Sequence, residues 1–103
     1  MSTLHTVNKS AFERNSLDTC LSVCKTDGSV LLIEDAVVSA LQDTGISAKI
    51  EKAVDSGIKF FALREDLEAR GLPEQRVLDK ITLVDYSGFV DLVTKNDRVQ
   101  NWL

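Results

Sequence analysis

The residues best equipped for group-transfer chemistry in this sequence are its two cysteines. A thiolate is a strong nucleophile, and its sulfur can carry a second sulfur atom as a persulfide. The spacing i, i+3, i+4, i+7 is typical of one buried helix face, and here it is formed by Leu17, Cys20, Leu21 and Cys24. At about 100° per residue, Cys24 lies near the middle of this face and Cys20 near its edge. Cys20 is therefore the candidate catalytic residue, while a place in the core is the alternative for both cysteines.

Metal binding and Ser-His-Asp catalysis find less support. A structural zinc site needs four nitrogen or sulfur ligands, and the chain offers only Cys20, Cys24 and His5 as good candidates. We therefore expect no metal site. No nucleophile elbow is present, and the only histidine falls within an expected strand. We interpret His5 as a sheet residue whose ring nitrogens bond to backbone groups.

Polar residues follow each apolar run, where the carboxyl ends of parallel strands gather functional groups. The first such segment, Asn8-Lys9-Ser10, has one hydroxyl and no glycine, so it does not predict a phosphate-binding loop. We expect no nucleotide or flavin cofactor, and a phosphate-binding signalling domain is only a third hypothesis. The acidic residues of the later segments are interpreted as helix caps and solvated loop charges, namely Glu34, Asp35, Asp66 and Asp85.

The pattern of apolar residues predicts the elements that position these side chains. Short runs rich in β-branched residues predict strands over 4–7, 30–33, 58–63 and 81–84. Helices are predicted around the two cysteines and over 35–41, 46–54, 64–71 and 87–95. Asp35 and Ser87 are the expected N-caps, and Gly71 is the expected C-terminal glycine. This alternation predicts an α/β fold, a three-layer α/β/α sandwich with an open, mostly parallel four- or five-stranded sheet.

Composition limits the class of protein. With 44% hydrophobic and 27% charged residues, the chain fits one globular domain over residues 1–103. A net charge of -4 with scattered basic residues argues against nucleic-acid binding. Two closely spaced cysteines do not make a secreted disulfide framework. Neither a signal peptide nor an apolar run long enough to cross a membrane is visible, so we expect a cytoplasmic protein without membrane contact.

Five segments in order carry a family resemblance: LHTVNKS at 4–10, LLIED at 31–35, ALREDLEARG at 62–71, VDYSGFV at 84–90 and VQNWL at 99–103. Together they resemble the DsrH/TusB family of sulfur-relay subunits, over essentially the whole chain. The resemblance implies a DsrE-like fold. It also implies a role as the smallest partner in a DsrEFH or TusBCD complex, a heterohexamer with two copies of each of three related subunits.

The resemblance further implies that this complex passes persulfide sulfur between protein cysteines, with the main active cysteine on the DsrE/TusD subunit. The implied partners are DsrE/TusD-like and DsrF/TusC-like subunits and a small DsrC/TusE-like sulfur carrier. The Tus branch ends in 2-thiouridine at the tRNA wobble position, and the Dsr branch serves dissimilatory sulfur oxidation. The chain is thus expected to be a subunit of a sulfurtransferase complex, not an enzyme on its own.

Cys20 ends the segment NSLDTC at 15–20, where DsrH proteins of sulfur oxidisers resemble one another in having a cysteine. The Tus branch can lack this cysteine, so the resemblance favours the Dsr branch and Cys20 as the persulfide carrier. Ala11 and Ala36 depart from the family, which often has Pro after Lys-Ser and Gly after Glu-Asp. No family role extends to Cys24. The alternative hypothesis is a non-catalytic interaction subunit that stabilises the hexamer while partner cysteines carry the sulfur.

Overall fold

In the computed structural model, which describes residues 2–24 and 28–102, five strands form one sheet. The strand order is β4-β3-β2-β1-β5, and all neighbouring strands are parallel. The prediction of an open, parallel α/β sheet is confirmed. In chain order the elements are β1 (Thr3–Val7), α1 (Ser16–Val23), β2 (Ser29–Leu32), η1 (Glu34–Ala40), α2 (Ser47–Asp55), β3 (Lys59–Leu63), α3 (Arg64–Ala69), η2 (Glu74–Arg76), β4 (Ile81–Val84), α4 (Tyr86–Lys95) and β5 (Arg98–Trp102).

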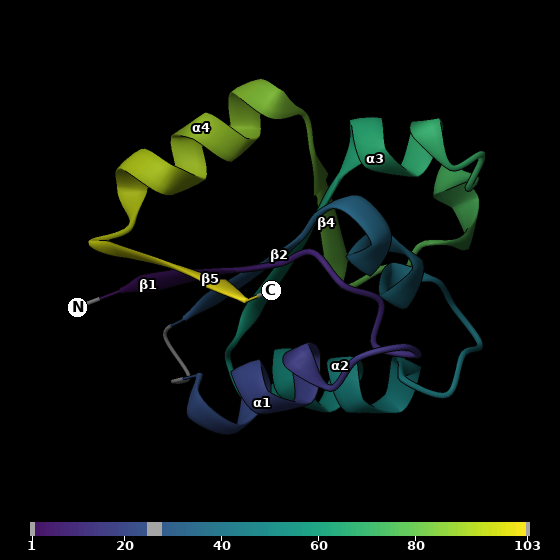
Figure 1. The fold of residues 1–103 in the computed structure, drawn as a ribbon, viewed down its shortest axis with the longest axis horizontal. Helices are drawn as coiled ribbons and strands as arrows, with labels where there is room; N and C mark the ends of the chain where they lie inside the picture. The colour runs from purple at the N-terminus through teal and green to yellow at the C-terminus, as the bar shows by residue number, and fades with distance from the viewer. Residues whose placement is uncertain (1, 25–27, 103) are drawn as a thin grey trace.

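Helices lie on both faces of this sheet and complete the predicted sandwich (Figure 1). On one face α1 and α2 lie side by side, joined by an ion pair between Asp18 and Lys49. On the other face lie α3 and α4. Strands β1 to β4 are added in one direction, whereas β5 pairs on the opposite side of β1. The strand order therefore reverses at β1, which lies in the interior of the sheet next to the edge strand β5.

The core joins the sheet to the inner sides of α1 and α2. Leu17, Cys20, Ile50 and Phe60 belong to this cluster, and each is at most 2% exposed. All four residues of β2 are buried, as expected for a central strand covered on both faces. In contrast, α4 has no buried residue. In this respect α4 differs from α3 on the same face, which buries Leu67.

The helix predicted over 35–41 with Asp35 as its N-cap differs in the structure. It is the 3-10 helix η1, which begins at Glu34 and has no side-chain cap. Glu34 has a φ of 51°, a left-handed conformation that non-glycine residues rarely adopt. Instead of capping, the Asp35 carboxylate pairs with Arg70, the C-cap residue of α3. A contact between distant segments has overridden the local capping preference.

The start of α4 also corrects a prediction, because its N-cap is Asp85 and not Ser87. The Asp85 Oδ1 atom accepts a hydrogen bond from the backbone N–H of Gly88 at 2.8 Å. A Cβ atom at Gly88 would lie 2.9 Å from the Val84 Cβ, so only glycine lets the helix turn this closely after β4. The predicted end of α3 is confirmed, since Gly71 follows it with a φ of 66°.

Candidate functional site

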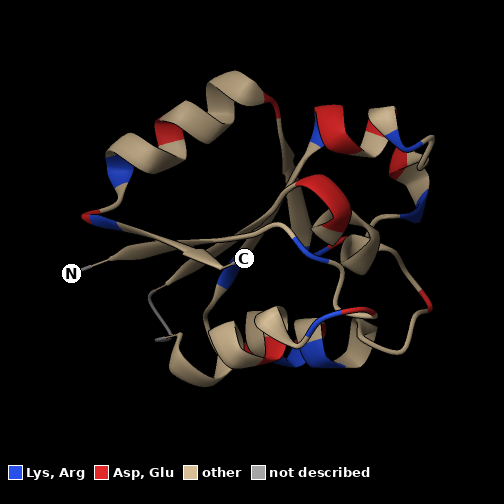
Figure 2. Ribbon diagram, in the orientation of Figure 1, with Lys and Arg blue, Asp and Glu red and all other residues tan. Residues whose placement is uncertain are grey.

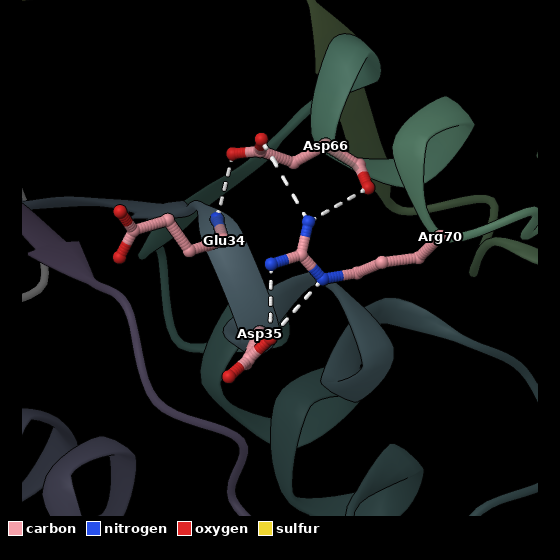
Figure 3. Close-up of polar contacts among 4 residues, drawn as sticks. All are labelled: Glu34, Asp35, Asp66 and Arg70. Atoms are coloured by element: carbon pink, nitrogen blue, oxygen red, sulfur yellow. Dashed lines mark hydrogen bonds and ion pairs between the residues drawn. The ribbon is translucent and has the colours of Figure 1, made fainter.

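The carboxyl ends of β2 and β3 bring together four charged residues, Glu34, Asp35, Asp66 and Arg70 (Figure 3). The Asp66 Oδ2 atom accepts a hydrogen bond from the backbone N–H of Glu34 at 2.6 Å. Arg70 donates to the Asp35 Oδ1 atom from Nε at 3.2 Å and from Nη2 at 2.9 Å. Its Nη1 atom donates to the Asp66 carbonyl oxygen at 3.2 Å. This cluster therefore ties the start of η1 to α3.

These contacts explain how Glu34 keeps its left-handed backbone. Such a conformation costs about 1–2 kcal/mol for a residue with a Cβ atom. A charge-assisted hydrogen bond from its N–H to Asp66 offsets that cost. In Figure 3 the Glu34 carboxylate points away from the other three side chains. Asp66 thus holds the backbone of Glu34, and Asp35 holds Arg70 and does not act as the predicted helix cap.

The next pair of strand ends, after β3 and β4, is also held by carboxylates. The Glu65 Oε2 atom accepts a hydrogen bond from the backbone N–H of Tyr86 at 3.2 Å, next to the Asp85 cap. Two carboxylates thus bind the amino end of α4, where the helix dipole favours negative charge. The Glu65 Oε1 atom is buried and has no hydrogen-bond partner among the described residues.

The loop after β1 is stabilised by two serine hydroxyls. Ser10 Oγ accepts from the backbone N–H of Phe12 at 3.2 Å, and Ser39 Oγ accepts from that of Ala11 at 3.1 Å. Ser39 is fully buried in η1, so it fixes this loop from a neighbouring element. No local pattern in the sequence points to Ser39, because only the fold brings together these residues, which are 28 positions apart. Both hydroxyls are used to order the loop.

Cys20 lies on the inner side of α1 and is fully buried in the core. The prediction that Cys20 occupies the more accessible edge of the helix is therefore wrong for this conformation. Burial, and next the nearby charge of Cys24, raises the pKa of the Cys20 thiol to about 12. At neutral pH such a group is almost entirely the protonated thiol, which is a poor nucleophile. Nor does Cys20 lie with the polar residues at the carboxyl ends of the strands.

Cys24 lies closer to the surface than Cys20, in the reverse of the predicted order. The reason is the length of the helix: α1 ends at Val23, and Cys24 is its C-cap with an extended ψ of 130°. A helical projection therefore does not apply to Cys24. Its side chain lines a groove of about 440 Å³ between α1 and α2, which Lys49 and Lys52 also line.

His5 is a buried sheet residue as predicted, but its ring meets a side chain. The Trp102 Nε1–H donates a hydrogen bond to the His5 Nδ1 atom at 3.0 Å, across the parallel pair β1 and β5. Burial lowers the pKa of His5. These two residues are 97 positions apart, so no local pattern in the sequence could have joined them.

The described ranges 2–24 and 28–102 lack two kinds of feature. Within them, no group of three or more His, Cys, Asp or Glu residues could hold a metal ion. No helix there is long and apolar enough to cross a membrane. Figure 2 shows Lys and Arg spread over separate elements and interleaved with Asp and Glu.

Comparison with known proteins gives a consistent result. The family described as DsrH like protein matches residues 9–99. A protein of Erwinia tasmaniensis called Protein TusB is 36% identical over 96% of this chain and 99% of its own length. Protein TusB of Pectobacterium atrosepticum is 33% identical over the same shares.

Solved structures support the fold in the same way. The ychN protein from E. coli superposes with a TM-score of 0.83 at 16% identity, over 99% of this chain and all of that one. Protein Tm0979 from Thermotoga maritima gives a TM-score of 0.65 at 23% identity, over 92% of this chain and 93% of that one. At these identities the two structures are evidence for the α/β fold alone.

Proposed function

The chain belongs to the DsrH family, and we propose that it is a subunit of a cytoplasmic sulfur-relay complex that transfers persulfide sulfur between protein cysteines. The observation that carries this proposal is similarity to two proteins named TusB, at 36% and 33% identity over 96% of the chain. A relay subunit needs thiols and partner surfaces and needs no bound cofactor. The absence of a phosphate-binding loop after β1 is compatible with that role.

The names of the relatives support the Tus branch, in which sulfur reaches the wobble uridine of tRNA as 2-thiouridine. The Dsr branch, favoured by the resemblance around Cys20, stays a prediction. Deleting the gene and measuring tRNA nucleosides by mass spectrometry separates the two. Loss of 2-thiouridine, restored by the intact gene, supports the Tus branch. Unchanged 2-thiouridine together with sulfite-reductase-like neighbouring genes would support the Dsr branch.

Within this function, Cys20 is the candidate persulfide carrier. Its thiolate would attack the outer sulfur of a donor persulfide, forming a new S–S bond while the old S–S bond breaks. The donor protein then leaves as a thiolate, so no external oxidant or reductant is needed. Because Cys20 is fully buried, this step requires α1 to move away from the sheet when a partner docks.

The carrier hypothesis is tested on the assembled complex with a persulfide donor and intact-mass measurement. We expect a mass gain of one sulfur atom on the wild-type chain, and the same gain on Cys24→Ser. The Cys20→Ala variant should show none. Retention of the full gain by Cys20→Ala contradicts the assignment of Cys20.

A second candidate function is the non-catalytic interaction subunit, which the burial of Cys20 favours. Such a subunit needs surface for partners, and the described chain exposes several large apolar side chains near α4 and β5. Tyr86 is 56% exposed, Val90 61%, Val93 38% and Val99 41%. DsrE/TusD-like and DsrF/TusC-like subunits would cover this surface in a heterohexamer with two copies of each subunit, and a DsrC/TusE-like carrier would bind the assembly.

Substitution of an exposed valine tests this docking surface. Val90→Asp places a charge on the outer side of α4, and Val23→Asp is the matched control on α1, where the valine is 58% exposed. After co-expression with the two partner subunits, native mass spectrometry should detect the hexamer with Val23→Asp and not with Val90→Asp. Hexamer of normal abundance with Val90→Asp contradicts the assignment of this surface. If Cys20→Ser also leaves relay turnover intact, the non-catalytic role replaces the carrier role.

A further inference from the structure

The parallel pairing of β1 and β5 places five polar or aromatic side chains on one face of the sheet. Thr3 pairs with Arg98, His5 with Gln100, and Val7 with Trp102. Because side chains two positions apart point to the same face of a strand, Thr3 and His5 lie on the same side as Arg98, Gln100 and Trp102. The hydrogen bond between His5 and Trp102 confirms that shared face.

These five side chains line an open pocket of about 550 Å³, together with Val23 and Val99. The pocket lies where α1 stops covering the sheet, since that helix ends at Val23. Neither the sulfur chemistry nor the family resemblance accounts for this pocket. Among the described residues that line it, Arg98 is the one cation and none is acidic.

The hydrogen bond from Trp102 fixes the protonation of His5. An indole N–H can only donate, so the His5 Nδ1 atom must be the acceptor and the ring proton lies on Nε2. His5 is only 7% exposed and borders the pocket. Its Nε2–H forms no hydrogen bond with any residue in the described ranges. This donor is therefore available to a group in the pocket.

Arg98 supplies the charge that such a group would need. Its guanidinium forms no ion pair within the described part of the chain. The neighbouring carboxylate of Asp97 accepts instead from the backbone N–H of Ser2 at 3.0 Å. A planar guanidinium matches a carboxylate with two parallel hydrogen bonds, and the Thr3 hydroxyl and the Gln100 amide add further donors.

From this geometry we propose that the pocket between β1, β5 and the end of α1 binds a small organic carboxylate. The carboxylate meets Arg98 and the His5 Nε2–H, and an apolar body packs against the Trp102 indole and the side chain of Val23. The donors alone would suit any anion, whereas the indole and the valine favour one that carries a hydrocarbon part.

The chain provides its own probes, because His5 is its only histidine and Trp102 its only tryptophan. We would titrate the purified full-length chain at constant ionic strength with phenylacetate and with its neutral analogue phenylacetamide. The readouts are the NMR signals of the Trp102 indole N–H and of the His5 ring. We expect saturable shifts of both signals with phenylacetate at a Kd of about 1 mM, and shifts at least about tenfold weaker with the amide.

Two arginine variants complete the test. Arg98→Gln removes the cation of the pocket, and Arg76→Gln is the control, because Arg76 lies in η2 and does not line it. Phenylacetate binding should weaken at least about tenfold in Arg98→Gln and stay unchanged in Arg76→Gln. Absence of saturable shifts in the wild-type chain up to about 20 mM would overturn the proposal, since millimolar binding is expected. Equal binding of the amide, or unchanged binding by Arg98→Gln, would overturn it as well. None of these results depends on sulfur transfer.

Discussion

Alkylation of Cys20 tests directly whether its burial controls its chemistry. In a Cys24→Ser variant the only remaining thiol is Cys20, which is fully buried. In the wild-type chain burial, and next the charge of Cys24, raises the Cys20 pKa from 9.0 to about 12, and the variant keeps burial, the larger cause. A shift of this size lowers the thiolate fraction near pH 8 by roughly 10³, and steric burial adds to the protection. Iodoacetamide should therefore label folded Cys20 at least about 10³-fold more slowly than the same chain in concentrated urea.

The assay follows intact mass against time over a series of pH values. Folded Cys20 should label about tenfold faster for each pH unit between pH 7 and 10, because only the thiolate reacts. The control variant Cys20→Ala retains Cys24, which lines the groove between α1 and α2, and it should label far faster in the folded state. If folded Cys20 labels within about tenfold of its rate in urea, the reasoning is refuted and α1 must open readily.

Four further predictions concern stability, measured by urea unfolding. Protonation of Cys20 should contribute its full share to the free energy of unfolding of the wild-type chain below pH 9. That free energy should fall by about 1.4 kcal/mol per pH unit as the pH rises toward 12, because in this range only the folded state keeps the Cys20 proton. The same fall in Cys20→Ala would contradict this prediction. Cys20→Ser should cost about 1–3 kcal/mol, because it buries a hydroxyl in the apolar core. Asp85→Ala should cost about 1 kcal/mol through loss of the cap, whereas Ser87→Ala should cost less than about 0.5 kcal/mol; equal costs would refute the capping assignment. Glu34→Gly should stabilise the chain by about 0.5 kcal/mol by relieving its left-handed backbone, while Ala36→Gly, at a fully buried position with an ordinary φ, should cost about 1 kcal/mol or more.

Much of the fold could be predicted because the signals are local. Strand β4 has the predicted bounds, and β1, β2 and β3 differ by a residue at one or both ends, since runs such as Val30-Leu31-Leu32 leave few alternatives. Strand β5 was not assigned, because Arg98–Trp102 is an exposed edge with polar residues and lacks such a run. Its pairing with β1 is a contact between the two ends of the chain.

The caps show where local signals fail. Both Asp35 and Ser87 are good N-cap types, yet neither caps a helix. Asp35 is held by Arg70, and Asp85 is two residues nearer than Ser87 to the end of β4, where the chain turns. Capping preferences amount to about 1 kcal/mol, so a single ion pair or a close approach between elements can reverse them.

The sequence alone determined that this chain is a parallel α/β protein of the DsrH family, because hydrophobic periodicity and motif order are properties of neighbouring residues. Only the tertiary structure decided which thiol is buried and which side chains share a pocket. Cys20 is inaccessible because α1 packs its inner side on the sheet. Cys24 is more accessible because α1 ends before it. His5 meets Trp102 because the strand order places β5 beside β1. Both results depend on how elements pack, and packing joins residues that no local pattern connects.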